Sequence, residues 1–526
     1  MKVKKVYTYS FYIVVLITIT AVSTILNGCK SKAQQNNVYQ LTGNDLVDGK
    51  NLVQIHCTGC HQLTPVDALT KDVWIYHILP SQAPKLGIST YMGNQYYIQD
   101  SSAVLNLNEW SKIVAYYEKL APTELPAAKV PEPLQKDWSI FSLKKPVAGA
   151  TTAFTTMAAV DPFSNNIYTS DLQTRKLLVW DSNLKPKLVA NLQTTAVGAD
   201  FIKNKDSTQG IFASIGTMDD ADSFLGKAEA FDLNDKKSTL KEALIASGLP
   251  RPVNIAHADF NKDGLNDFVL SCNGGKRSGG LYLLTQKVNQ QYNQNKLKEA
   301  PGAIQAIIGD FNNDGWPDVM ALFGKGDEGV WLFLNDHKGS FTSQNILRFP
   351  PVYGSSSFQL VDFNRDGKLD ILYTCGNNFG NSRILKPYHG VYIFLNQGNF
   401  KFKQNYFYPV NGCTKAIAAD FNQDGKMDIA TIAFFADLKN NPSEGFIYFE
   451  QNRPLHFIPH AVPVSSYGRW KSMDIIEHNG KPDLVLGNYA NGFKIQDIPT
   501  FWNKNLPFIV LENRSSGSAN PQKNTF

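Results

Sequence analysis

The chain has 526 residues, 43% of them hydrophobic, with 51 basic and 46 acidic side chains. This length is too great for one hydrophobic core, so we expect several domains. Without Lys2, Lys4 and Lys5 the balance falls to 48 basic against 46 acidic residues, which gives no electrostatic basis for binding nucleic acid.

The first 28 residues have the pattern of an export signal. Three lysines precede an almost unbroken apolar or small stretch from Tyr7 to Leu26. The stretch leads into an L-N-G-C run that resembles a bacterial lipoprotein box, in which Cys29 is lipidated. An uncleaved transmembrane anchor is the alternative, since the stretch is long enough to span a bilayer. In both cases we expect the rest of the chain in the bacterial cell envelope, on the periplasmic side or at the cell surface.

A haem attachment motif follows a polar tether predicted over residues 29–42. Cys57-Thr58-Gly59-Cys60-His61 is a C-x-x-C-H run, which is typical of c-type haem attachment. Each cysteine can form a thioether to a haem vinyl group, and His61 then becomes the proximal iron ligand. No second C-x-x-C run exists to complete a zinc site, so we expect one covalent haem c.

A helix is predicted from Asn106 to Leu120, with Asn106 and Glu109 spaced as a capping pair. The apolar residues that share one face of it are Trp110, Ile113, Val114, Tyr117 and Leu120. With Gly49-Lys-Asn-Leu52 followed by His56-Cys57, residues 43–122 resemble a small class I cytochrome c. The resemblance implies an all-α haem domain over residues 43–121, whose first helix enters the haem motif and whose last helix crosses the first.

The sixth iron ligand has several candidates. Met92 is the only methionine between His61 and Met157, and it precedes the last helix, where the cytochrome family places its ligand. His77 is a rival, which is otherwise a helix-surface histidine, and an open iron is the third possibility. Residues 74–88 also resemble the haem domain of envelope proteins that join a cytochrome to VCBS repeats, several of which carry methionine where Gln82 stands here.

Four prolines in residues 122–136 predict a stiff, extended linker. Beyond it, residues 137–514 are β-like and repetitive, and the polar residues 515–526 are a predicted frayed tail. A nine-residue motif, D-F-N-x-D-G-x-x-D, begins at Asp259, Asp310, Asp362 and Asp420.

The spacing of this motif predicts the larger fold. Its starts are 51, 52 and 58 residues apart, a period typical of propeller blades. Three degenerate copies begin at Asp161, Asp200 and Asp474, which makes seven units. A small antiparallel sheet repeated seven times closes best as a ring without long exposed edges. We therefore predict an all-β seven-bladed β-propeller.

The motif also has the chemistry of a calcium loop. Hard oxygen ligands at positions 1, 3, 5, 7 (a backbone carbonyl) and 9 surround one point, while glycine at position 6 permits a sharp turn. Phenylalanine at position 2 is expected to pack into the blade. An acidic turn that binds no metal is the alternative, which four copies of one skeleton disfavour. The predicted ligands are Asp259, Asn261, Asp263, Leu265 and Asp267; Asp310, Asn312, Asp314, Trp316 and Asp318; Asp362, Asn364, Asp366, Lys368 and Asp370; and Asp420, Asn422, Asp424, Lys426 and Asp428.

These repeats resemble the FG-GAP/VCBS family, the calcium-bearing propeller repeat also found in integrin α-subunits. The resemblance covers residues 161–514 and implies about four calcium ions that stiffen the blades rather than catalyse a reaction. The family mostly builds binding scaffolds, so it implies little about function.

Three functions remain open at this point. The first is a lipid-anchored monohaem electron carrier that serves a redox partner in the envelope, with a propeller that docks a protein or glycan. The second is a propeller-based dehydrogenase that passes electrons to the haem, although no GxSxG or HExxH motif is present. The third is a non-redox adhesion or glycan-binding protein. An electron carrier is favoured over a catalyst.

Three further cysteines, Cys272, Cys375 and Cys413, have no role in these motifs. An oxidising compartment permits one disulfide among them, and buried free thiols are the alternative.

Overall fold

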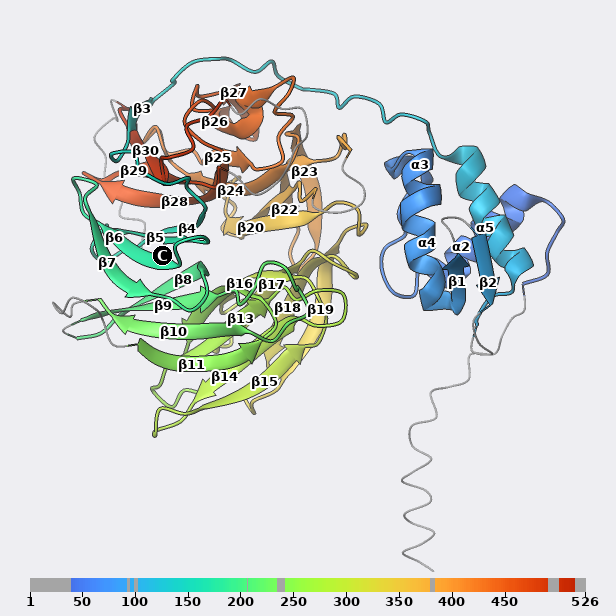
Figure 1. Cartoon of the computed structure of the whole chain (residues 1–526), viewed down its shortest axis with the longest axis horizontal. Coiled ribbons are helices and arrows are strands. Elements are labelled where there is room, and N and C mark those ends of the chain that lie inside the picture. The colour runs from blue at the N-terminus through green and yellow to red at the C-terminus, as the bar shows by residue number, and fades with distance from the viewer. Residues whose placement is uncertain are drawn as a thin grey trace, which may run out of the picture.

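The computed structural model describes residues 39–91, 95–98, 103–205, 207–233, 242–378, 384–490 and 501–515. A helical segment, drawn in blue in Figure 1, lies beside a ring of β-sheets. The predicted export signal, Cys29 and Met92 all lie outside the described residues.

The ring consists of seven four-stranded antiparallel sheets, which confirms the predicted seven-bladed propeller. From the innermost strand outward, blades 1–3 are β4 (Thr155–Val160), β5 (Ile167–Asp171), β6 (Lys176–Trp180) and β7 (Pro186–Asn191); β8 (Ala196–Lys203), β9 (Thr208–Ser214), β10 (Gly226–Asp232) and β11 (Glu242–Leu249); and β12 (Pro252–Ala258), β13 (Asp267–Cys272), β14 (Gly280–Gln286) and β15 (Tyr292–Lys298). Blades 4–6 are β16 (Ala303–Gly309), β17 (Asp318–Phe323), β18 (Gly329–Asn335) and β19 (Phe341–Arg348); β20 (Ser355–Val361), β21 (Asp370–Cys375), β22 (Gly390–Asn396) and β23 (Phe402–Pro409); and β24 (Cys413–Ala419), β25 (Asp428–Ala433), β26 (Phe446–Arg453) and β27 (His456–His460).

Blade 7 is assembled from both ends of the propeller sequence. Its strands are β28 (Trp470–His478), β29 (Lys481–Asn488), β30 (Phe508–Asn513) and, outermost, β3 (Phe141–Lys144). β3 pairs antiparallel with β30, so the first propeller strand closes the ring on the last blade.

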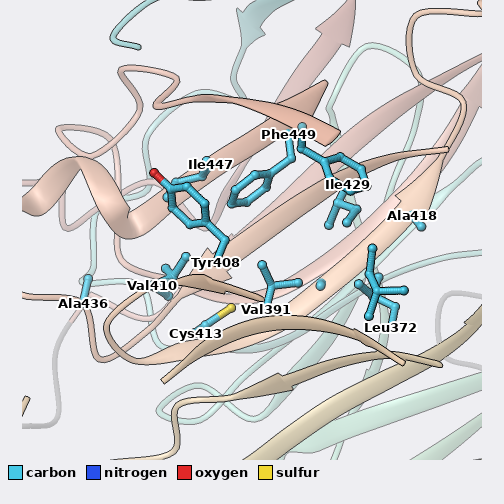
Figure 2. Close-up of a cluster of buried hydrophobic side chains, with 14 of the residues drawn as sticks. Leu372, Val391, Tyr408, Val410, Cys413, Ala418, Ile429, Ala436, Ile447 and Phe449 are labelled. Atoms are coloured by element: carbon cyan, nitrogen blue, oxygen red, sulfur yellow. The ribbon is translucent and has the colours of Figure 1, made fainter. Parts of the chain in front are cut away.

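Burial explains the sequence of each strand. The second strands of blades 3 to 6 are buried at every residue, as expected for strands covered on both faces. The innermost strands converge on the axis and favour small residues: a Cβ built on Gly198 would lie 2.7 Å from the carbonyl oxygen of Val253 in the next blade. Between neighbouring sheets, apolar side chains fill the space, as in the cluster between blades 5 and 6 around Val391 and Ile429 (Figure 2).

Each innermost strand has a register shift at its first residues, for example between Ser355 and Ser357. Polar side chains then join adjacent innermost strands around the central channel. Gln359 Oε1 accepts from the Ala418 amide at 2.7 Å, and Asp474 Oδ2 accepts from the Val160 amide at 2.8 Å. These bonds hold neighbouring blades in fixed register near the axis.

The helical segment contains α2 (Asp45–Cys57), η1 (Val66–Ala68), α3 (Lys71–Val73), the π-helical turn η2 (Trp74–Ile78), α4 (Leu79–Gln82), η3 (Ala83–Leu86) and α5 (Leu107–Leu120). The expected all-α character is incomplete, because β1 (Ile88–Tyr91) and β2 (Gln95–Ile98) form an antiparallel hairpin. The predicted last helix is confirmed as α5, with a capping box between Asn106 and Glu109. α2 and α5 cross closely: a Cβ on Gly49 would lie 2.3 Å from the carbonyl oxygen of Lys112.

The linker is held along the propeller rather than free. Gln135 forms a parallel bridge with His460 of β27, and Glu132 accepts from the hydroxyl of Tyr408 at 2.9 Å. The helical segment also meets blade 5, where the Tyr388 hydroxyl donates to the carbonyl oxygen of Ala68 at 3.0 Å.

Candidate functional site

The C-x-x-C-H run lies at the end of α2. Asn44 caps the start of this helix by accepting from the amides of Leu46 and Val47. Cys57 is the last helical residue and packs against the apolar core of the segment, whereas Cys60 is exposed. Burial raises the pKa of the Cys57 thiol to about 11. The two thiols therefore differ: one borders the core and the other faces solvent.

The imidazole of His61 is oriented for a ligand role. Its Nδ1 lies 2.8 Å from the carbonyl oxygen of Gln62, a contact in which Nδ1–H donates. Such a bond fixes the tautomer and leaves Nε2 with its lone pair available for a metal. This residue set fits the predicted haem, with two thiols and one oriented imidazole within five consecutive residues.

The described residues include one candidate side chain for the sixth ligand, His77, and also Gln82, which stands where several similar envelope proteins carry methionine. His77 lies on η2 and is exposed, and Gln82 is partly buried at the end of α4. Met92 falls outside the described residues, so its role stays a prediction.

The four strong repeats place their nine-residue loops between the first and second strands of blades 3, 4, 5 and 6, on what we call the bottom face. In the first loop, the Asp259 carboxylate accepts from the amides of Asp263 at 3.1 Å and Gly264 at 2.8 Å. Asn261 Oδ1 also accepts from the Asp263 amide. The other three loops repeat these bonds. The backbone thus turns the oxygens of positions 1, 3 and 5 inward.

Backbone geometry supports this wrapping. The position-6 glycines have positive φ, as predicted, for example 83° at Gly264. The residue at position 4 also has positive φ, for example 58° at Lys262, which the motif alone did not reveal. Position-2 phenylalanines pack into the blades, with Phe363 4% and Phe421 0% exposed.

The aspartates at position 9 begin the second strands and are fully buried. Asp267 accepts from the amides of Phe260 at 3.1 Å and Gln286 at 2.8 Å. Burial is the largest cause that raises its pKa to about 6, and the nearby carboxylates of Asp263 and Asp259 contribute less. The same causes raise the pKa of Asp428 to about 7. Concentrated negative charge with hard oxygen donors fits a calcium ion.

Basic side chains contact the position-5 aspartate in three of the four loops. The ammonium groups of Lys368 and Lys426 contact Asp366 and Asp424, and His337 Nε2 lies 2.8 Å from Asp314 Oδ2. In the described part of the chain, no group of three His, Cys, Asp or Glu side chains is positioned to hold a metal. Calcium in these loops therefore stays a prediction.

The degenerate repeats do not form such loops. Asp200 and Asp474 lie within β8 and β28, and Asp161 directly follows β4. The connections at residues 204–207 and 479–480 are too short for the nine-residue turn. Asp200 instead contacts Nδ1 of His257 in the next blade at 2.6 Å, so this pair joins blades 2 and 3.

Cys272, Cys375 and Cys413 are buried free thiols, and Cys375 Sγ lies 3.2 Å from the carbonyl oxygen of Tyr388. The structure thus agrees with the expectation of buried free thiols at these three cysteines.

Comparisons with known proteins identify the repeats. A family model for the FG-GAP-like repeat matches residues 259–321, 310–373 and 384–431. All four strong loops lie within these segments, so the propeller contains FG-GAP-like repeats.

The chain is also similar to parts of larger proteins. It is 33% identical over 141 residues to a T-cell immunomodulatory protein homolog of Plasmodium falciparum, covering 24% of this chain and 19% of that protein. It is 28% identical over 178 residues to integrin alpha-3 of Cricetulus griseus, covering 31% and 17%. The chain thus spans less than a third of each relative.

Among solved structures, an ancestral GH74 enzyme matches with a TM-score of 0.47 and 11% identity, covering 72% of this chain and 52% of that one. A gluconolactonase from Xanthomonas campestris matches with a TM-score of 0.35 and 9% identity, covering 58% and 92%.

Proposed function

We propose that this protein is a monohaem electron carrier of the bacterial envelope, fused to a calcium-stabilised propeller that docks a partner. The orientation of His61 carries the proposal: its Nδ1 contact with Gln62 leaves Nε2 available for a metal, and Cys57 and Cys60 precede it in the same C-x-x-C-H run. Haem c, when bound, would supply one-electron chemistry.

The residues of the helical segment would set the environment of that chemistry. Cys57 and Cys60 would hold the group covalently, and His61 would ligate the iron from one side. Met92 is the preferred ligand on the other side, with His77 or an open position as alternatives. The segment also exposes several large apolar side chains, a surface suited to an apolar macrocycle or a redox partner: Ile55, Tyr76, Tyr91, Tyr97, Ile98 and Val104.

Calcium would be held on the bottom face by the oxygens of positions 1, 3, 5, 7 and 9 in the four strong loops. A bound cation would offset the mutual repulsion of these carboxylates and stabilise the turns. We assign it no catalytic role.

The propeller would dock a protein or glycan ligand. Similarity to integrin alpha-3 supports a binding module, and it equally favours a second candidate, a non-redox adhesion protein. Attachment through a lipid on Cys29 would hold either protein at the envelope. Among the described residues, no helix is both long and apolar enough to cross a bilayer.

An absorption spectrum of the full chain, made in a host that matures c-type cytochromes, tests the haem. We expect a reduced spectrum with thioether-type bands that survive denaturation, since the attachment is covalent. Cys57→Ala with Cys60→Ala should lose the covalent haem, whereas Cys272→Ala, a buried cysteine outside the motif, should keep it. A colourless wild-type protein would contradict the electron carrier and leave the adhesion module.

A further inference from the structure

Four basic side chains from three blades gather at the top mouth of the central channel, opposite the calcium loops. Arg251 directly precedes β12, Lys325 follows β17, and Arg469 and Lys471 flank the first residue of β28. Arg251 is near enough to lower the pKa values of both Lys325 and Lys471. For Lys325, burial is the larger cause and brings its pKa to about 8.

Neutral groups hold these cations in place. Lys325 Nζ donates to Asn273 Oδ1 and to the carbonyl oxygen of Gly274, both at 2.8 Å. Arg469 Nε donates to the carbonyl oxygen of Phe434 at 2.9 Å, and its guanidinium lies 3.9 Å from the centre of that ring. Lys471 Nζ lies 5.4 Å from the same ring. These contacts to carbonyl oxygens, an amide oxygen and an aromatic ring hold the basic side chains in place but carry no negative charge to neutralise them.

The nearby carboxylate is committed elsewhere. Asp222 accepts from the amides of residues 276–278 and from the Ser278 hydroxyl at 2.8 Å, and it offsets only part of the charge on Lys325. Over the residues that the structure describes, Arg251, Lys325 and Lys471 take part in no ion pair.

We propose that the top mouth of the channel binds a small molecule that carries two or more carboxylate or phosphate groups. Arg251 and Lys325 lie on blades 3 and 4, while Arg469 and Lys471 lie on blade 7, so two separated anionic groups suit the site better than one. Lys471 belongs to an innermost strand and is exposed there, so a ligand can reach it from solvent. This site goes beyond the proposed electron transfer and docking, and it does not depend on haem.

Thermal unfolding of the full chain in excess calcium tests this site. Tricarballylate is the carboxylate probe and fructose 1,6-bisphosphate, which carries two separated phosphate groups, is the phosphate probe, each compared with NaCl at the same ionic strength. We expect a saturable rise in Tm with at least one probe, and the probe that acts at lower concentration identifies the chemistry. A rise no greater than that in NaCl with both probes would overturn the proposal.

Substitutions locate the binding. Lys471→Gln should weaken the apparent affinity about tenfold or more, because a charge-assisted bond is lost. Without a probe, its Tm should equal or exceed that of the wild type, since like-charge repulsion falls. Lys187→Gln, on the exposed outer strand β7, is the matched control and should change neither quantity.

Isothermal titration of Arg251→Gln provides a second readout from the other side of the channel. Arg251→Gln should lose about as much affinity as is expected for Lys471→Gln, and it keeps the proposal testable if Lys471→Gln does not fold. Wild-type affinity in both variants would exclude this site.

Discussion

The aspartate at position 9 of each strong repeat has a structural role besides its predicted ligand role. Asp370 joins the start of its own strand to the rest of the blade by accepting from the Phe363 amide at 3.0 Å and the Asn396 amide at 2.9 Å. The repeat spacing predicted a ligand at this position, but the second role requires the register of β21 against β22, which no motif encodes.

Glu328 is another buried carboxylate, and it makes stability depend on pH. It is fully buried, contacts the Ser355 amide at 2.5 Å, and has Lys386 as a charged neighbour. Burial raises the pKa of Glu328 to about 7 from its ordinary value of 4.5. Between these values the folded protein binds more protons than the unfolded chain, so this group lowers stability as pH rises.

Glu328→Gln should remove that loss. We expect the difference in the free energy of unfolding, variant minus wild type, to be up to about 3 kcal/mol larger at pH 7.5 than at pH 4.5. Urea unfolding in saturating calcium at both pH values measures this difference. Asp219→Asn, at an exposed acid between β9 and β10, is a control that should show no comparable change. A constant difference between Glu328→Gln and wild type across this range would contradict the assigned pKa.

At the scale of elements, the crossing of α2 and α5 depends on one missing side chain. Gly49 brings α2 against Lys112 and Tyr116 of α5, and an added Cβ would lie 2.6 Å from the Tyr116 Cβ. The capping pair and the periodicity predicted α5, and the resemblance to a class I cytochrome c implied the first helix and its crossing by the last. The dependence of that crossing on Gly49 appeared only in the fold.

Gly49→Ala should separate the two helices and destabilise the helical segment by about 1–3 kcal/mol, because the crossing is overpacked. Hydrogen exchange of the amides in α2 and α5 measures this loss within the full chain. Gly59→Ala, where nothing lies within 4 Å of an added Cβ, should leave exchange unchanged. Equal protection in Gly49→Ala and wild type would show that the helices tolerate a wider crossing.

The bottom-face loops are elements whose stability should depend on calcium. Chelation with EDTA should lower the Tm of the propeller by about 5 °C or more, because the carboxylates of each loop lose their counter-ion. Excess Ca²⁺ should restore the Tm, and Mg²⁺ should restore it less, since it fits a smaller octahedral site. An unchanged Tm in EDTA would argue for loops that turn without metal.

At the scale of the whole molecule, the repeat predicted seven blades, and the structure has seven. The origin of the fourth strand in blade 7 was not predictable from that period, because β3 carries no repeat motif and lies far from β30 in sequence. The grouping of basic residues at the channel mouth was likewise not predictable, because these residues are far apart in sequence and come together only when the ring closes.

Phe141 secures this closure. It is 4% exposed, and its ring lies 5.3 Å from Tyr448 and 6.0 Å from Phe421 of blade 6. Phe141→Ala should lower the free energy of unfolding by about 3–5 kcal/mol through the cavity it leaves. Denaturant titration in calcium measures this value. Val147→Ala, at a residue 91% exposed just after β3, should change it by less than about 0.5 kcal/mol. Equal losses in the two variants would show that β3 does not stabilise the ring.

Closure by β3 also imposes an order on biosynthesis. Strand β3, which completes blade 7, is synthesised before the other propeller strands. Its partner β30 is synthesised last and is complete only at residue 513. A nascent or truncated product that stops short of blade 7 therefore leaves β3 without its partner strand and leaves blades 1 and 6 without a neighbour on one face, and such exposed surfaces promote aggregation and proteolysis. Incomplete copies would thus be removed, and only finished molecules would persist.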